Sequence, residues 1–405
     1  MILQLALGII TAIGGFLDAG AIATSASAGA LYGFQLIWAV IVGTFCVILL
    51  VEMSGRLSAV SHHTVADAVR ERLGFRYFAV PLTIEMMQDV LVLGAEIGGI
   101  AVALHLATGF DYRVFVIPVA LMIWALIWFG NFSVIENGVS FLGLVALAYV
   151  AAPFFTGAPW RQAALGAVPS LPSHDPAQYW LLAVSIIGSV LEPFLMNFYA
   201  SGAVEEQWTV KYLGMNRLIA LFGMSFGAAI AIGIIVMSAT TLAPRGIHVD
   251  SFEQAVVTLV APFGEWGLSL FVATLGIACL GAASDLSLNI GYAISQGFGW
   301  NWSENLKPHQ DARFAACYTL AIPTGAVVVL FFEPLKVTML AMALNTVIAP
   351  LIVFPLLILM NDKQYLRQYT NGPVANALVT LVVVLACIVG VIALPLEIIG
   401  GGNGG

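Results

Sequence analysis

The chain has 405 residues, of which 60 % are hydrophobic and only 9 % are charged, and its net charge is −8. This apolar share exceeds what the core of a soluble domain needs, and the negative charge argues against a nucleic-acid partner. The composition therefore predicts a polytopic membrane protein, organised as one transmembrane domain over residues 1–405.

Eleven apolar stretches are long enough to cross a bilayer, which takes roughly 20 helical residues each. If the N-terminus is cytoplasmic, the predicted inner loops hold 10 of the 14 Lys and Arg residues and the outer loops hold 4. This bias predicts a cytoplasmic N-terminus and an outer C-terminus. The compact loops and the absence of a targeting segment indicate the inner (plasma) membrane of a bacterial cell. We expect the spans near residues 5–31, 34–60, 77–106, 113–130, 136–156, 179–204, 212–242, 262–297, 313–332, 336–360 and 374–397.

The segment 61–75, SHHTVADAVRERLGF, separates the second span from the third. Its charges and its candidate N-cap residues, Ser61 or Thr64, predict a short helix at the inner membrane surface. The cysteines indicate neither a disulfide framework nor a zinc site, because they lie far apart within predicted spans and form no CxxC pair. They are Cys46, Cys279, Cys317 and Cys387.

The first span carries an acid where its helix is weakest. Residues 14–29 read GGFLDAGAIATSASAG, so glycines and other small residues surround Asp18 and helix propensity is low there. We expect a break at this point, which hydrocarbon tolerates where the unpaired backbone lines a polar cavity or holds an ion. Asp18 beside exposed carbonyls suits a cation; the alternative is that Asp18 only caps the broken helix.

The sixth span has a second acid, which stands beside a helix breaker. In IIGSVLEPFLMNFYASGAVEE (186–206), Glu192 immediately precedes Pro193, which lacks a backbone donor and disfavours helix at the preceding step. We therefore predict a kink or a break here. The alternative for Glu192 is a protonated carboxyl that bonds a nearby carbonyl and has only a structural role.

Each predicted break lies in the first helix of one half of the chain. Interrupted helices at corresponding places in two halves are typical of transporters built from inverted repeats. We therefore expect an all-α five-plus-five inverted repeat with about 11 transmembrane helices, of which helices 1 and 6 are broken. The first repeat covers about 5–156, the second about 179–360, and an extra helix about 374–397.

Further acids lie within the spans. Glu85, Asp89 and Glu96 fall in TIEMMQDVLVLGAEIGG (83–99), where their spacing places them on one helix face, and Asp285 lies in the eighth span. An intramembrane acid costs ~2.5–3.5 kcal/mol on insertion scales and usually lines an ion pathway or a proton relay. Because the spans hold almost no Lys or Arg, we expect a metal ion or a proton to visit these acids.

Each of these residues also has a structural interpretation. Glu96, Asp89 and Asp285 would equally suit a satisfied polar network. Glu85 is expected to lie close enough to the inner surface to be solvated. Asn197, in the sixth span, is a further pathway candidate, although an amide near a kink more often bonds the backbone than a substrate.

Several segments together resemble the Nramp family of divalent-metal transporters, over most of the chain. Residues 16–74 resemble the family's first two helices and the following loop, with DAGA standing where the family has Asp-Pro-Gly-Asn. The similarity to the third, sixth, eighth and tenth helices is carried by GAEIGGIAVAL (94–104), GSVLEPFLMNFYASGAV (188–204), LGAASDLSLNIGYAISQGF (280–298) and PLIVFPLLILMNDK (350–363). The resemblance rests on the order and spacing of these segments, and it implies a LeuT-like fold.

The resemblance also implies a metal site at Asp18, Ala21, the carbonyl of Ser189, and Glu192. Two of these positions have changed character, since Ala21 replaces an Asn and Glu192 replaces the Met of a Met-Pro-His motif. Loss of the thioether and gain of a carboxylate favour hard cations, so we expect Mg²⁺ or Mn²⁺ rather than Fe²⁺ or Cd²⁺. The position vacated at Ala21 suits an ion that keeps part of its water shell, as Mg²⁺ does.

We expect weak or absent proton coupling. The family's histidine after the sixth-helix proline is Phe194 here, and the family's Asp three residues before Glu96 is Leu93. The membrane potential would then draw the cation inward, with ~2.3 kcal/mol per charge per 100 mV. The acids of the third span keep a proton route open.

The resulting hypothesis is a secondary transporter that carries a hard divalent cation into the cell by alternating access around Asp18 and Glu192. We expect it to work as a monomer and without a cofactor, the cation being its substrate. The alternatives are a proton-coupled carrier of Mn²⁺ or of a small organic cation, and a sensor that binds without transport. We do not expect the protein to be an enzyme, because the sequence lacks the Gly-x-Gly-Asp motif of an intramembrane aspartyl protease.

Overall fold

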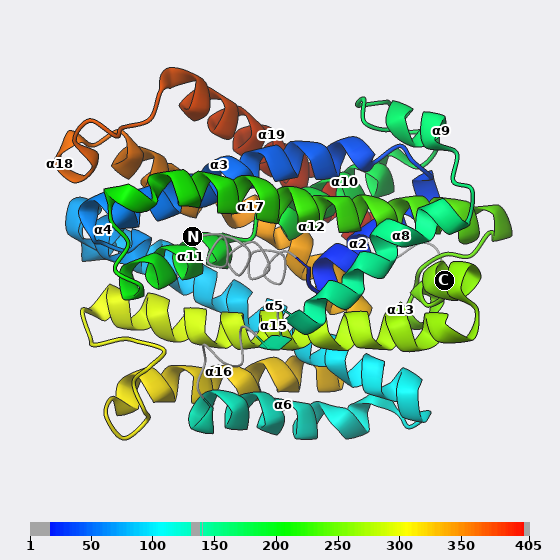
Figure 1. Cartoon of the computed structure of the whole chain (residues 1–405), viewed down its shortest axis with the longest axis horizontal. Coiled ribbons are helices and arrows are strands. Elements are labelled where there is room, and N and C mark those ends of the chain that lie inside the picture. Colours follow the sequence, from blue (N-terminus) through cyan, green and yellow to red (C-terminus); the bar gives the residue numbers. More distant parts are fainter. Residues whose placement is uncertain (1–16, 131–137, 140, 401–405) are drawn as a thin grey trace.

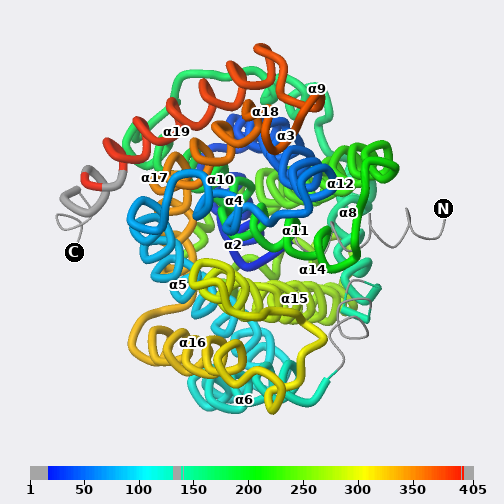
Figure 2. The backbone as a smooth tube through the Cα atoms, turned by 90° about the vertical axis from the view of Figure 1, so that its left-hand side faces the viewer, coloured from blue at the N-terminus to red at the C-terminus, as the bar shows by residue number. Residues whose placement is uncertain are grey.

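The computed structural model of the chain describes residues 17–130, 138–139 and 141–400, which form helices and connecting loops without a strand. Most of the long helices run along the longest axis of the molecule (Figure 1). The view turned by 90° shows α2 (Ala19–Tyr32) and α11 (Pro193–Glu205) near its middle, with other helices around them (Figure 2).

By length and composition, nine helical segments of the described chain are able to cross a membrane. They match nine of the eleven predicted spans. The first and fifth predicted spans include residues outside the described ones. The described part of the first forms α2, and that of the fifth includes η1 (Leu144–Leu147) and α8 (Ala148–Phe155). The nine segments are formed by α3 (Ile37–Ser61), α5 (Phe75–Thr108), α6 (Tyr112–Phe129), α10 (Pro176–Val190) with α11, α12 (Leu213–Thr241), α15 (Glu265–Phe298), α16 (Ala312–Phe331), α17 (Pro334–Met360) and α19 (Pro373–Gly400).

Shorter helices connect these segments or lie at their ends. They are α4 (Val65–Leu73), η1 (Leu144–Leu147), α8 (Ala148–Phe155), α9 (Trp160–Leu165), η2 (Val210–Tyr212), η3 (Ala243–Arg245), α13 (Phe252–Ala255), α14 (Val257–Phe263) and α18 (Lys363–Leu366). The predicted surface helix is α4, and its N-cap is Thr64, whose hydroxyl accepts the Asp67 N–H at 3.2 Å. Of the two N-cap candidates, the structure therefore selects Thr64.

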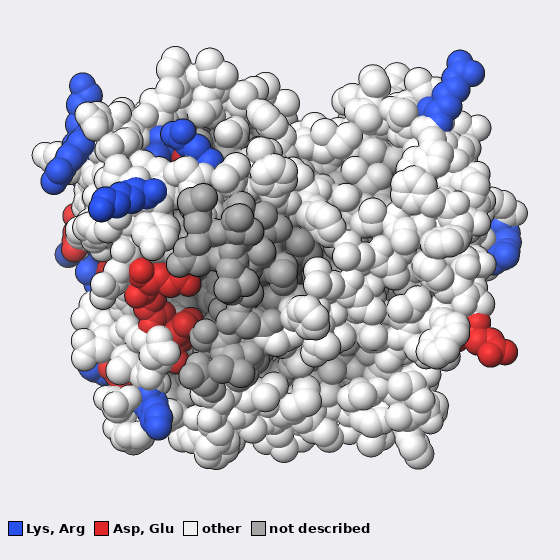
Figure 3. Space-filling view, viewed as in Figure 1, with Lys and Arg blue, Asp and Glu red and all other residues white. Residues whose placement is uncertain are grey.

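On one face of the molecule, the exposed charged side chains gather at its two ends (Figure 3). On the face seen in Figure 3, Lys, Arg, Asp and Glu lie at both ends, and more of them at the end where Figure 1 places α4 and α18. The described residues of the band between the ends show none on this face. This distribution is that of a protein whose middle faces hydrocarbon and whose ends face water.

The two half-length helices α2 and α11 lie among the long ones. α5 packs against α15, α16 and α17, while α2 contacts α10, α12 and α17, and α11 contacts α3, α15 and α17. The N-terminal ends of both half-helices are therefore inside the protein. The residues that precede them, Asp18 and Glu192, are 2 % and 5 % exposed.

Gly188 allows α10 and α17 to approach each other closely. A Cβ at this position would lie 1.9 Å from the Met342 carbonyl oxygen and 2.6 Å from the Thr346 hydroxyl. Because the first of these is a backbone atom, the helices would have to move apart to accept a side chain. Gly188 stands just before the break in the sixth span, so this contact also holds the end of α10 in place.

Gly188→Ala is expected to lower the apparent melting temperature of the detergent-solubilised protein by a few degrees, since overpacking costs typically ~1–3 kcal/mol. Gly202→Ala, in α11, is the matched control, because a Cβ there meets nothing within 4 Å. Its melting temperature should not fall. A Gly188→Ala protein as stable as the parent would contradict the close approach of α10 and α17.

Candidate functional site

The sixth predicted span is broken where the sequence indicates. α10 ends at Val190 and α11 begins at Pro193, so Glu192 lies outside both helices. Pro193 has no N–H, and the carbonyl of Ser189, four residues earlier, therefore lacks its helical donor. The expected break is confirmed, and it leaves a backbone oxygen available close to Glu192 in the chain.

Asp18 stands at the start of α2 as its N-cap. One carboxylate oxygen, Oδ1, accepts the Ala21 N–H at 2.6 Å. The other oxygen, Oδ2, is buried and receives no N–H or hydroxyl from the described part of the chain. The capping role weighed as an alternative thus exists, but it uses only one of the two oxygens. The part of the predicted break before residue 17 lies outside the described residues.

Asp18 and Glu192 meet at the two helix ends. Their carboxyl groups are in direct contact. Two carboxylates in contact repel each other unless they share a proton or hold a cation between them. Each carboxyl also occupies the N-cap position of a helix, α2 or α11, where the helix dipole favours negative charge. The site therefore collects negative charge and requires a positive ion or a proton to balance it.

Glu96 joins this pair from α5. Its Oε2 accepts the Ala19 N–H at 3.2 Å, while its buried Oε1 has no hydrogen-bond partner among the described residues. Among the described residues, no Lys or Arg lies within ion-pair distance of Asp18, Glu96 or Glu192. The three carboxyl groups thus have no basic side chain to neutralise them.

The predicted ligand positions Ala21 and Ser189 both lie near these acids, and neither brings a charge. Ala21 is buried in the first turn of α2 and offers only a methyl group beside its N–H. The Ser189 hydroxyl bonds the Ile186 carbonyl at 3.0 Å and lies 3.4 Å from the Thr24 hydroxyl of α2. Within the described ranges no three His, Cys, Asp or Glu side chains form a metal-binding group. A cation bound here would therefore need carbonyl oxygens or water as further ligands.

Two amides that the sequence analysis missed hold Glu192 in place. Asn345 Nδ2, on α17, lies 3.3 Å from both Glu192 Oε1 and the Gly188 carbonyl oxygen and donates to them. Gln88 Nε2, on α5, donates to Asn345 Oδ1 at 3.0 Å. In the sequence, each of these residues is a single amide within an apolar span, which marks it as unusual. Its partners could not be inferred, because they lie far away in the sequence.

Sulfur atoms also border the site, which the sequence analysis did not foresee. All four cysteines are free, and the Cys279 thiol of α15 lies beside Glu96. The thioether of Met342 packs against the backbone at Gly20, because a Cβ there would come 2.3 Å from its Sδ atom. Softer ligand atoms are thus present at the edge of an otherwise oxygen-rich site.

The remaining predicted residues form a second group on α5, α11 and α15. Asn197 Nδ2 donates to Glu85 Oε1, and Asn289 Nδ2 donates to Asp89 Oδ2 at 2.9 Å. The expectation that Glu85 is solvated was wrong, because only 3 % of it is exposed. The expectation that the Asn197 amide bonds backbone was also wrong, because Glu85 is its partner. Asp285 is half-buried on α15, one turn before Asn289.

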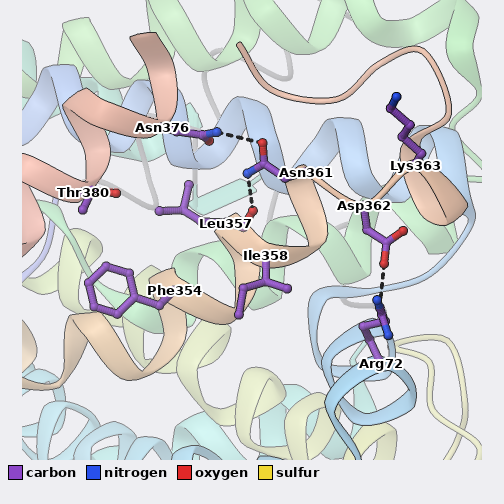
Figure 4. Close-up of a pocket in the computed structure, with 9 residues that line it drawn as sticks. All are labelled: Arg72, Phe354, Leu357, Ile358, Asn361, Asp362, Lys363, Asn376 and Thr380. Atoms are coloured by element: carbon purple, nitrogen blue, oxygen red, sulfur yellow. Dashed lines mark hydrogen bonds and ion pairs between the residues drawn. The ribbon is translucent and has the colours of Figure 1, made fainter. Parts of the chain in front are cut away.

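A pocket of about 670 Å³ lies at the edge of the molecule, away from these acids. Figure 4 shows its lining from α17, α18, α19 and α4, with Arg72 paired to Asp362 across its rim at 2.6 Å. The N–H of Gln364 and the Arg72 guanidinium lower the pKa of Asp362, so the two opposite charges are already matched. The pocket therefore offers no unbalanced negative charge for a cation, since its remaining charged residue is Lys363.

A family model described as Nramp, natural resistance-associated macrophage protein-like, matches residues 8–395. The chain belongs to the Nramp family. A relative in Caldanaerobacter subterraneus, named divalent metal cation transporter MntH, is 21 % identical over 384 residues, which cover 91 % of this chain and 87 % of the relative. The MntH of Aeromonas hydrophila is 25 % identical over 386 residues, which cover 92 % of this chain and 90 % of that relative. These relatives are membrane transporters and not enzymes.

Solved structures give the fold of this Nramp chain. A manganese transporter of Eremococcus coleocola, in complex with an aromatic bis-isothiourea compound, superposes with a TM-score of 0.77 at 18 % identity, covering 99 % of this chain and 87 % of that one. Mhp1, a nucleobase-cation-symport-1 transporter, superposes with a TM-score of 0.63 at 13 % identity, covering 96 % and 92 %. The expected all-α, LeuT-like architecture is confirmed.

Proposed function

We propose that this Nramp protein is a secondary transporter that carries a hard divalent cation, Mg²⁺ or Mn²⁺, into the cell by alternating access around Asp18 and Glu192. One observation carries the proposal: two buried carboxyl groups, each at the start of a half-length helix, touch each other without a basic partner in the described chain. The names of the MntH relatives, divalent metal cation transporters, support it.

The ligand atoms favour a hard cation. Asp18, Glu192 and the carbonyl of Ser189 offer only oxygen, which Mg²⁺ and Mn²⁺ prefer. Softer ions are the second candidate, and the position of Met342 Sδ against Gly20 favours them. That sulfur comes from α17 and not from either helix break, so we assign it to packing.

We further propose that transport is driven by the membrane potential, with weak or no proton coupling. Phe194 stands where a histidine would follow the proline, and its side chain is buried and carries no titratable group. A divalent cation gains about 4.6 kcal/mol from a potential of 100 mV, since each charge contributes ~2.3 kcal/mol. This is sufficient for uphill uptake without protons.

The charge distribution supports a cytoplasmic N-terminus and the end with α4 and α18 as the inner one. Arg56, Arg70, Arg72 and Lys363 lie on α3, α4 and α18, the elements of that end. A functional monomer is part of the proposal, because both half-helices and all the clustered acids come from one chain.

Proteoliposomes with an inside-negative potential, an ion-sensitive dye and an internal pH dye test the proposal. We expect uptake of Mg²⁺ and Mn²⁺ that grows with the potential and leaves the internal pH unchanged; protein-free vesicles are the control. Acidification in step with uptake would instead support the proton-coupled alternative. Binding without any flux would support a sensor, and absence of both would overturn the metal assignment in favour of an organic cation.

A further inference from the structure

Four buried polar side chains meet on the α4 side of the Asp18 cluster. Glu85 and Asp89 come from α5, Asn197 from α11 and Asn289 from α15, and each is at most 5 % exposed. The two amide nitrogens donate to the two carboxylates, Asn197 to Glu85 and Asn289 to Asp89. Asn289 also interacts with Glu85, so the four residues form one group.

The group has more acceptor oxygens than donors. Asn197 Oδ1 and Asn289 Oδ1 are buried and have no hydrogen-bond partner among the residues that the structure describes. Glu85 and Asp89 repel each other, and no Lys or Arg in the described ranges pairs with either. A purely structural network would satisfy its buried amide oxygens and balance its charges. This group does neither.

Two carboxylates and two amide oxygens are the ligand types that hard divalent cations use in proteins. We propose that Glu85, Asp89, Asn197 and Asn289 form a second cation site, which takes Mg²⁺ or Mn²⁺. The inference rests on the proposed function, because it places this site on the route between the Asp18 site and the inner end of the protein.

The position of the group fits such a route. Asp89 and Glu96 are seven residues apart on one helix, so the two sites are separated by about 10 Å along α5. They are close enough for the charge of Asp89 to act on Glu192. Beyond the group, Gln296 Nε2 donates to the Ser201 hydroxyl at 2.8 Å, and the Thr64 hydroxyl, at the start of α4, donates to Gln296 Oε1 at 2.9 Å. Polar side chains thus continue from this site to α4.

The number of Mn²⁺ ions bound per chain tests the inference. Mn²⁺ is titrated into the purified full-length protein in detergent, and unbound Mn²⁺ is measured by electron paramagnetic resonance. We expect two ions per chain for the parent. The double variant Glu85→Gln/Asp89→Asn should bind one, because both replacements keep an oxygen for the amide donors but remove the charge. Asp18→Asn/Glu192→Gln should also bind one, at the remaining site.

Glu265→Gln is the matched control, because it removes an exposed acid at the other end of α15 and should leave two ions bound. Thermal melting shows whether each variant is folded, and Glu85→Gln alone replaces the double variant if the latter is not.

Three results would overturn the second site. One ion in the parent, lost in Asp18→Asn/Glu192→Gln and kept in Glu85→Gln/Asp89→Asn, would leave the proposed function standing and assign the four residues to a proton or a structural network. Two ions that the Glu85 and Asp89 replacements do not reduce would place the second ion elsewhere. Absence of any bound Mn²⁺ in the parent would overturn the second site together with the proposed function.

Discussion

Asp18→Asn is expected to reduce Mg²⁺ uptake into proteoliposomes more than a hundredfold while the protein remains folded. The replacement removes one of the two carboxylates that would face the ion. Removing one partner of a buried charge pair costs about 3–5 kcal/mol, which corresponds to a factor of more than a hundred in binding. The fold should survive, because Asn is as good an N-cap as Asp and its oxygen can still accept the Ala21 N–H. Initial uptake rates and melting temperatures together check this result.

Asp111→Asn is a matched control for that experiment. Asp111 is also the N-cap of a membrane helix, α6, and accepts the Arg113 N–H at 2.8 Å, but it is exposed. The same chemical change at this position should leave uptake unaltered. Uptake by Asp18→Asn at the parental rate would mean that Asp18 only caps α2, and the site would have to be sought among the other acids.

The helix break in the sixth span was predictable from sequence because its cause is local. Pro193 lacks an N–H and restricts the residue before it, whatever the rest of the chain does. Low helix propensity around Asp18 similarly predicted a break in the first span. α2 begins at the next residue, Ala19, while the part of that span before residue 17 lies outside the described residues. The apolar stretches predicted the long helices because hydrocarbon tolerates few charges.

The partners of the acids were not predictable, since they depend on how distant helices pack. Asn345 reaches Glu192 across 153 positions of sequence, and Asn289 reaches Asp89 across 200. Glu85 was expected to lie close enough to the inner surface to be solvated, but it is buried against α11, whose Asn197 donates to it. Helical periodicity predicted that the acids of α5 share one helix face, but it could not predict which side chains of other helices lie opposite that face.

Glu192→Met is expected to abolish Mg²⁺ uptake and to permit Cd²⁺ binding. The replacement removes two carboxylate oxygens and places a thioether beside Asp18. Mg²⁺ requires hard oxygen ligands, whereas a thioether suits softer ions such as Cd²⁺. This change in ion preference is measured by the uptake of each ion under an inside-negative potential and by calorimetry of Cd²⁺ binding.

Glu192→Gln distinguishes the effect of losing the carboxylate charge from the effect of gaining a sulfur atom. Its amide oxygen can still accept the Asn345 donor that now reaches Glu192 Oε1, so the local hydrogen bond is kept. We expect this variant to lose Mg²⁺ uptake without gaining Cd²⁺ binding. Mg²⁺ uptake retained in Glu192→Met would remove Glu192 from the site. The Met342 thioether already lies against Gly20 and is the other possible soft ligand. If the parent binds Cd²⁺ and Met342→Leu does not, this thioether is a metal ligand and the site favours a softer ion.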